Sequence, residues 1–129
     1  MKPLSAATLL LAALLCAPVA ALAALKAGDP APPFKTPAAV AGQAFDFDLS
    51  AALKKGPVVL YFFPKAFTKG CTVEANAFAE ATPQFAALGA TVVGISHDDI
   101  ETLKKSSTKE CPNKFAVASD PNALTTKAY

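Results

Sequence analysis

The stretch VVLYFFPKAFTKGCTVEA, residues 58–75, decides the fold of this chain because it joins three local signals. Residues 58–63 form a continuous β-branched and aromatic run, which is typical of a strand buried on both faces. Pro64 ends that run, and a short loop over residues 65–70 follows it. From Cys71 onward the pattern is helical, so the sequence predicts a strand, a tight loop and a helix that begins at a cysteine.

The position of Cys71 has chemical consequences. The first turn of a helix carries backbone N–H groups without intrahelical partners, and the helix dipole places partial positive charge there. Both features favour the thiolate form of a cysteine, which is the nucleophilic form. Thr68 can place a hydroxyl beside the sulfur or its target, and Pro64 can exclude water without adding a hydrogen-bond donor. The alternative is a buried structural cysteine that has no chemical role.

Strand-like and helix-like segments alternate on both sides of this junction, after an extended, proline-rich lead-in over residues 26–40. The expected strands are 43–49, 58–63, 91–96 and 115–118. The expected helices are 51–55, capped by Ser50, 71–88, with a kink or break at Pro83, and 100–110, followed by a final helical turn after Asp120 and Pro121. This alternation predicts parallel pairing in an α/β fold, in which helices flank a layered central sheet.

Composition narrows the class of protein. The 129 residues allow one domain, and the hydrophobic fraction of 53% is too high for a disordered chain. Twelve basic residues, all lysine, face 10 acidic residues without a clustered basic excess, which excludes a nucleic-acid-binding module. With one histidine and three cysteines, a structural zinc site of three or four side chains is not expected.

The N-terminal segment predicts export. Lys2 precedes an apolar run from Leu4 to Leu25 that ends in small residues, which is typical of a secretory signal peptide over residues 1–23. Cleavage is expected after Ala23, or equally after Ala24. An uncleaved membrane anchor is the alternative, because the run is near the length that spans a bilayer.

Cleavage leaves a domain of residues 24–129 in the periplasm, or otherwise outside the cytoplasm, without membrane contact. Cys16 is removed with the leader. Cys71 and Cys111 then remain as an even pair in an oxidising compartment.

The pattern Pro-x-x-x-Thr-x-x-Cys, formed by Pro64, Thr68 and Cys71, resembles the active-site signature of peroxiredoxins. Its flanks, with LGATVVGIS at 88–96 and ASDP at 118–121, are similar to the bacterioferritin-comigratory or Q-type branch. The resemblance covers the whole mature chain. It implies a thioredoxin-like fold and a thiol peroxidase that reduces hydrogen peroxide and organic hydroperoxides without metal or haem.

The resemblance also implies residue roles. Cys71 is the peroxidatic cysteine, Thr68 binds the peroxide by a hydrogen bond, Pro64 shields the sulfur, and Glu74 supports the surrounding hydrogen-bond network. Attack of the thiolate on the O–O bond gives a sulfenic acid and releases water or an alcohol. A thioredoxin-like disulfide oxidoreductase is the alternative enzyme, but Glu74 stands where its Cys-x-x-Cys motif needs the second cysteine.

The sequence departs from the Q-type pattern at the resolving cysteine. Many members carry it five positions after the first cysteine, where this chain has Asn76. Other members place it in the helix that here ends at Cys111, which suggests an intramolecular disulfide between Cys71 and Cys111 that a thioredoxin-like dithiol reduces. Alternatively, Cys111 is a spare thiol or pairs with another chain.

A second departure is the absence of arginine from the whole sequence. Peroxiredoxins use a late arginine to hold the thiolate and polarise the peroxide, and lysine lacks its planar fork. Family members also continue with further strands and a final helix. The resemblance therefore predicts a C-terminally truncated chain with slow or absent turnover and marginal stability. A monomer or a homodimer is expected. A non-catalytic redox-fold module is the remaining alternative.

The polar residues after the strand at 91–96 are interpreted as structural. His97 is expected to serve a loop or a helix cap, because no cluster of partner residues is evident in the sequence. Asp98 and Asp99 are expected to be charges at the start of a helix rather than a catalytic pair of carboxylates.

Overall fold

The computed structural model describes residues 24–129, so the predicted signal peptide at 1–23 lies outside the described residues. The strands are β1 (Lys35–Val40), β2 (Gln43–Asp48), β3 (Val58–Phe63), β4 (Thr91–Ser96) and β5 (Ala116–Ser119). The helices are α1 (Leu49–Leu53), α2 (Lys69–Ala87), α3 (Ile100–Lys109) and α4 (Leu124–Ala128). Within residues 24–129, no helix has the length and apolar character needed to cross a membrane.

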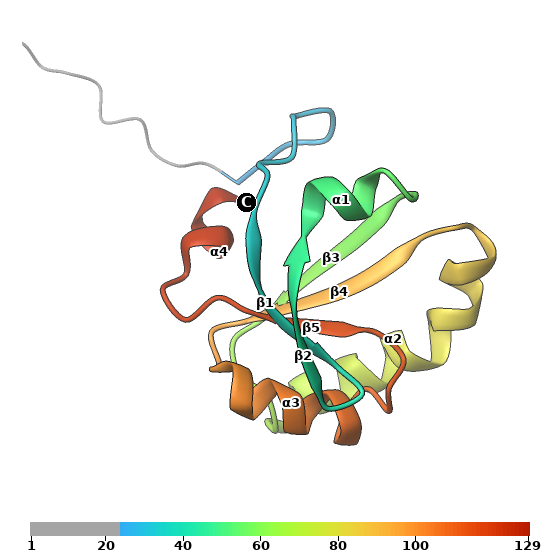
Figure 1. The fold of residues 1–129 in the computed structure, drawn as a ribbon, viewed down its shortest axis with the longest axis vertical. Helices are drawn as coiled ribbons and strands as arrows, with labels where there is room; N and C mark the ends of the chain where they lie inside the picture. Colours follow the sequence, from blue (N-terminus) through green and yellow to red (C-terminus); the bar gives the residue numbers. More distant parts are fainter. Residues whose placement is uncertain (1–23) are drawn as a thin grey trace, which may run out of the picture.

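The strands form one mixed sheet in the order β2-β1-β5-β4-β3 (Figure 1). β3, β4 and β5 run parallel, and α2 and α3 make the crossovers between them. This part confirms the predicted parallel α/β arrangement. β1 is antiparallel to both β2 and β5, so the first part of the sheet differs from the prediction.

The predicted lead-in over residues 26–40 is expected to contain no strand, and this is wrong, because β1 lies within it. Its sequence contains Pro37, and proline is rare in central strands because it cannot donate to the ladder. The ladder from β1 to β5 uses only Ala38 and Ala39, which are fully buried, and leaves Pro37 outside it. A turn of two residues, Ala41 and Gly42, then leads to β2. These two residues have φ values of 51° and 76°, as in tight hairpin turns.

The cap of α1 also differs from the prediction. The helix begins at Leu49, and the carboxylate of Asp48 caps it by accepting a hydrogen bond of 3.2 Å from the backbone N–H of Ala51. Ser50 therefore lies inside the helix rather than at its cap. Asp48 takes the position because aspartate is as good a cap as serine and ends the preceding strand.

Helix α2 begins two residues before Cys71 and continues through Pro83 to its end. The proline therefore does not break the helix. In the turn before it, the Thr82 hydroxyl donates to the carbonyl of Phe78 at 2.9 Å. Phe78 and Phe85 pack against the core, and this packing outweighs the one backbone hydrogen bond that a proline removes.

Two apolar clusters lie on the two faces of the sheet. The cluster under α2 and α3 contains Tyr61, Phe63, Leu103, Cys111 and Phe115, and Cys71 packs against it. The other lies on the face of the sheet where Figure 1 shows α1 and α4. It contains Leu49 of α1, and Tyr129, directly after α4, packs against it. In the first cluster, the Tyr61 ring lies over the neighbouring strand at Gly94, where a Cβ atom would come within 2.7 Å of the ring.

Candidate active site

Cys71 stands in the first turn of α2, as the sequence predicts. The helix begins at Lys69, and the backbone N–H of Thr72 donates to the carbonyl of Thr68 at 2.9 Å. Cys71 precedes that bond, so its N–H is one of the unpaired donors of the helix start. The side chain is partly exposed and packs against the apolar cluster under α2 and α3.

Pro64 and Thr68 lie at the two ends of the loop that joins β3 to α2, and both are exposed. The Thr68 hydroxyl donates to the carbonyl of Lys65 at 3.1 Å and makes no capping bond to α2. Pro64 lines a hollow of about 230 Å³ together with the exposed His97. The predicted site residues Pro64, Thr68 and Cys71 are therefore part of one strand–loop–helix unit.

The backbone of this loop is strained at Phe67, which has a φ of 62°. The left-handed region is unfavourable for a side chain larger than glycine, at a cost of roughly 1–2 kcal/mol. The Phe67 side chain is 48% exposed, so core packing does not hold it in place. The loop is instead held through the backbone N–H groups of Ala66 and Phe67, which both donate to carboxylates.

These carboxylates belong to Asp98 and Glu110, which lie at the two ends of α3. Asp98 accepts from the N–H of Ala66 at 2.6 Å, and Glu110 accepts from the N–H of Phe67 at 3.0 Å. Glu110 also accepts from the Thr72 hydroxyl. The sequence patterns do not predict a role for Glu110, although an acidic residue at the negative end of a helix dipole is an unusual feature.

The two aspartates before α3 have different roles. Asp99 caps the helix, as predicted, because its carboxylate accepts from the N–H of Thr102 at 2.8 Å. The backbone and hydroxyl hydrogen bonds from Thr102 lower the pKa of Asp99. Asp98 binds the loop and the Ser96 hydroxyl, so its interpretation as a simple helix-start charge was incomplete.

Glu74 lies on the exposed side of α2. The hydrogen bonds around the loop in the described part of the chain go to Asp98 and Glu110. The supporting role of Glu74 stays a prediction.

Cys111 follows Glu110, the C-cap residue of α3, and is fully buried. Its thiol donates to the carbonyl of Ser106 at 3.7 Å. Burial raises the pKa of Cys111 to about 12, and the negative charge of Glu110 contributes to the same shift. Cys111 and Cys71 are both free thiols, and both contact the same apolar cluster.

Tyr61 belongs to this cluster as well. Burial raises the pKa of Tyr61, and four nearby ionisable groups add to the shift: Cys111, Glu74, Glu110 and Cys71. The Tyr61 hydroxyl is buried and has no hydrogen-bond partner within residues 24–129.

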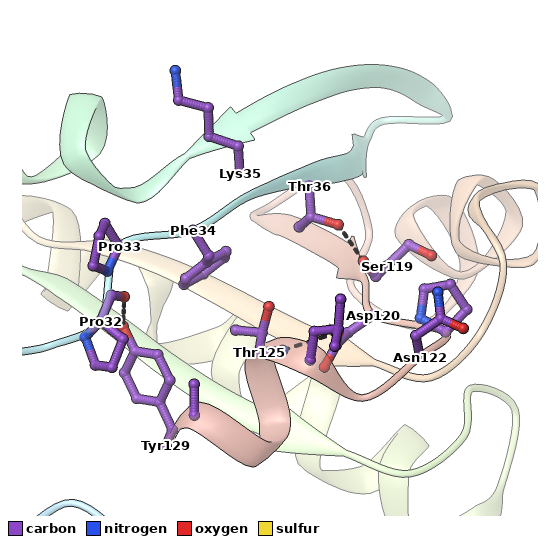
Figure 2. A pocket seen from close by; sticks show the side chains of 13 residues that line it. Pro32, Pro33, Phe34, Lys35, Thr36, Ser119, Asp120, Asn122, Thr125 and Tyr129 are labelled. Carbon is purple, nitrogen blue, oxygen red and sulfur yellow. Dashed lines mark hydrogen bonds between the residues drawn. The ribbon is translucent and has the colours of Figure 1, made fainter.

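A larger hollow, of about 370 Å³, lies between the lead-in to β1 and the segment from β5 to α4 (Figure 2). The Tyr129 hydroxyl donates to the carbonyl of Pro32 at 2.7 Å, and the Asp120 carboxylate accepts from the N–H groups at the start of α4. No cysteine lines this hollow, so it is separate from the thiol site. Between residues 24 and 129, no group of three or more His, Cys, Asp or Glu side chains is arranged to hold a metal ion.

Comparison with known proteins gives consistent results. A family profile described as the AhpC/TSA family matches residues 27–129. Peroxiredoxin Bcp of Escherichia coli is 38% identical over 96 residues, which are 74% of this chain and 58% of that protein.

Solved structures of related proteins are also similar to this chain. Peroxidoxin BcpB of Mycobacterium tuberculosis superposes with a TM-score of 0.71 at 32% identity, over 79% of this chain and 64% of that chain. A structure of the Xanthomonas campestris bacterioferritin comigratory protein, described for its alkyl peroxide reduction activity, gives a TM-score of 0.62 at 30% identity, over 71% and 57%.

The chain thus spans less than two thirds of the length of each of these relatives. The superpositions confirm the thioredoxin-like fold predicted from the sequence. The strand–loop–helix unit around Cys71 lies inside the matched region. The chain belongs to the AhpC/TSA family, and its relatives assign it to the bacterioferritin-comigratory, or Q, type of peroxiredoxin.

Proposed function

We propose that this chain carries the peroxide-reducing centre of a thiol peroxidase and that Cys71 is the attacking residue. The observation that supports this most directly is the place of Cys71. Its thiol is partly exposed in the first turn of α2, where unpaired N–H groups and the helix dipole favour a negatively charged sulfur. Thr68 occupies the N-cap position of the same helix and places a hydroxyl at the end of the same loop.

The proposed step is a nucleophilic substitution at oxygen. The Cys71 thiolate attacks one oxygen of the peroxide, an S–O bond forms, and the O–O bond breaks. The sulfur is oxidised to a sulfenic acid, and the peroxide is reduced to water or an alcohol, whose oxygen takes a proton from solvent. Pro64 is proposed to limit water access, and the Thr68 hydroxyl to form a hydrogen bond with the bound peroxide.

Organic hydroperoxides are proposed as substrates beside hydrogen peroxide. Two exposed apolar side chains flank the thiol in sequence: Phe67, which is 48% exposed, and Val73, which is 64% exposed. Such side chains can contact the alkyl part of a hydroperoxide. The alkyl peroxide reduction described for the Xanthomonas campestris relative supports this proposal.

Cys111 is proposed as the resolving cysteine. Its thiol condenses with the sulfenic acid of Cys71, which forms the disulfide and releases water, and a thioredoxin-like dithiol then reduces that disulfide. The contact of both cysteines with one apolar cluster supports the pairing. Because Cys111 is fully buried and its pKa is raised to about 12, its segment must open before the thiol can react.

Two stoichiometric measurements test the role of Cys71. We expect iodoacetamide to alkylate Cys71 faster at neutral pH than it alkylates free cysteine. When the Cys111→Ser variant, which cannot form the proposed disulfide, is treated with one equivalent of hydrogen peroxide, dimedone should add to Cys71, as detected by mass spectrometry. A Cys71 that reacts no faster than free cysteine and gives no dimedone adduct would remove the basis of the proposed activity.

A separate measurement tests Cys111. Non-reducing peptide mass spectrometry after one equivalent of peroxide should show the Cys71–Cys111 disulfide. The matched Cys111→Ser variant should instead keep the sulfenic acid on Cys71. If the wild-type protein forms no such disulfide, Cys111 has no part in the reaction, while the proposed role of Cys71 is unaffected.

A further inference from the structure

We propose that Asp98 and Glu110 are positioning residues that hold the loop before Cys71 from the two ends of α3. The inference deepens the proposed function of Cys71 and rests on it. Asp98 lies directly before the N-cap of α3, and Glu110 is its C-cap residue. A single helix therefore carries both carboxylates that bind the loop.

The two carboxylates bind neighbouring backbone donors. Asp98 Oδ2 accepts from the N–H of Ala66 at 2.6 Å, and Glu110 Oε1 accepts from the N–H of Phe67 at 3.0 Å. Phe67 is the residue with the unfavourable left-handed backbone. Hydrogen bonds to charged acceptors are roughly twice as strong as neutral ones, so they can hold a strained conformation.

Glu110 also connects the loop to the helix that carries the thiol. Its Oε1 accepts from the Thr72 hydroxyl as well as from the N–H of Phe67, so one oxygen binds residues on both sides of Cys71. Its Oε2 accepts from the Ser106 hydroxyl at 2.7 Å, which fixes the plane of the carboxylate. Glu110 is only 3% exposed, and a low-dielectric environment strengthens these hydrogen bonds.

The buried Glu110 carboxylate at the C-terminal end of α3 destabilises that helix. A buried carboxylate loses hydration, and the C-terminal end of a helix dipole repels negative charge. The start of α3 has its own cap in Asp99, which leaves Asp98 free to bind Ser96 and the loop. The donors that compensate Glu110 from outside α3 belong to Phe67 and Thr72, so this carboxylate serves the loop and the first turn of α2.

Substitution separates positioning by hydrogen bonds from a general effect on folding. Glu110→Ala removes both acceptors, whereas Glu110→Gln keeps Oε1 for Phe67 and Thr72, and its amide can donate to the Ser106 oxygen. We expect the alanine variant to form the Cys71 sulfenic acid at least about tenfold more slowly with one equivalent of hydrogen peroxide, because small displacements of reacting groups are costly. The glutamine variant should react close to the wild-type rate.

Amide hydrogen exchange supplies a readout that does not depend on peroxide chemistry. In Glu110→Ala, the N–H of Phe67 should exchange faster, while amides in β4 keep their protection. Glu110→Gln should restore the protection of Phe67. Glu101→Ala is the matched control and should change neither readout, because this exposed carboxylate of α3 pairs with Lys104 at 3.0 Å and makes no hydrogen bond to the loop within residues 24–129.

Asp98→Ala provides an independent variant if Glu110→Ala does not fold. It should accelerate exchange at Ala66 and slow sulfenic acid formation, and Asp98→Asn should restore both. Unchanged peroxide reactivity and loop exchange in the folded alanine variants would overturn the proposal, as would amide variants that react as slowly as the alanine ones. If the wild-type protein itself does not react with peroxide, the proposed function fails, and the exchange measurement alone still decides whether the carboxylates hold the loop.

Discussion

Cys71 lies at the start of α2, whereas Cys111 lies directly after the end of α3, and the surroundings of the two cysteines differ accordingly. Cys71 is partly exposed in the first turn of α2, at the positive end of a helix dipole. Cys111 is fully buried just beyond the negative end of α3, beside the Glu110 carboxylate. The same side chain is thus placed once in a partly exposed site at a helix start and once in a buried site beside a carboxylate. This difference supports the proposal that Cys71 reacts first and Cys111 second.

The strongest test of this contrast exchanges the two cysteines for serine one at a time. Cys71→Ser should abolish capture of peroxide oxygen by the domain of residues 24–129, because Cys111, the other thiol of that domain, is buried and protonated. Cys111→Ser should capture one oxygen per chain, as intact-mass measurement in the presence of dimedone would show. Equal oxidation of the two variants would mean that the surroundings do not decide which cysteine reacts.

Alkylation of the native protein should show a smaller difference of the same kind. We expect iodoacetamide to label Cys71 at least about 100-fold faster than Cys111 at pH 7, which corresponds to local opening of about 2.7 kcal/mol around Cys111. In concentrated denaturant the two rates should converge. Comparable rates in the folded protein would show that the segment after α3 is already open.

Alkaline pH should weaken the fold through Cys111. Its pKa is raised from 9.0 to about 12 in the folded state, so between these values the unfolded chain has lost a proton that the folded chain keeps. The free energy of unfolding therefore falls as pH rises through this range, by about 1.4 kcal/mol per pH unit for one proton. The Cys111→Ala variant should show a shallower slope by that amount in urea titrations from pH 9 to 11, whereas an unchanged slope would show that the thiol already ionises in the folded protein.

Substitution of Tyr61 is expected to have the smallest effect. The Tyr61 hydroxyl lies near both thiols and is buried without a hydrogen-bond partner in the described part of the chain. Tyr61→Phe should raise the free energy of unfolding by about 1 kcal/mol, because it removes an unsatisfied buried polar group. Chemical denaturation at neutral pH measures this change. A destabilised phenylalanine variant would mean that the hydroxyl has a partner in solution, and the ionisable groups near it are those of Cys111, Glu74, Glu110 and Cys71.

The sequence predicted the parts of the molecule that depend on local patterns. The apolar run of β3 is confirmed, and a helix follows the loop as predicted but begins at Lys69, two residues before Cys71. These elements could be predicted because each is encoded within a few neighbouring residues. β1 was missed because its proline-rich sequence becomes a strand only through its ladders to β2 and β5. A strand of this kind leaves no periodic signal in the sequence.

The hydrogen bonds to the loop were missed for a related reason. Asp98 and Glu110 bind partners that lie 32 and 43 residues away in the sequence. No spacing rule connects residues so far apart. The sequence likewise placed Cys111 at a helix end but gave no indication that the side chain is fully buried there.

The packing of Tyr61 on Gly94 has a consequence for how this sequence can diverge. Because any side chain at position 94 would enter the space of the tyrosine ring, the two positions cannot vary independently. A larger residue at 94 becomes acceptable only after the aromatic ring at 61 has been replaced by a smaller side chain. The two positions should therefore covary among related proteins, and a library that randomises one of them alone should return few folded variants.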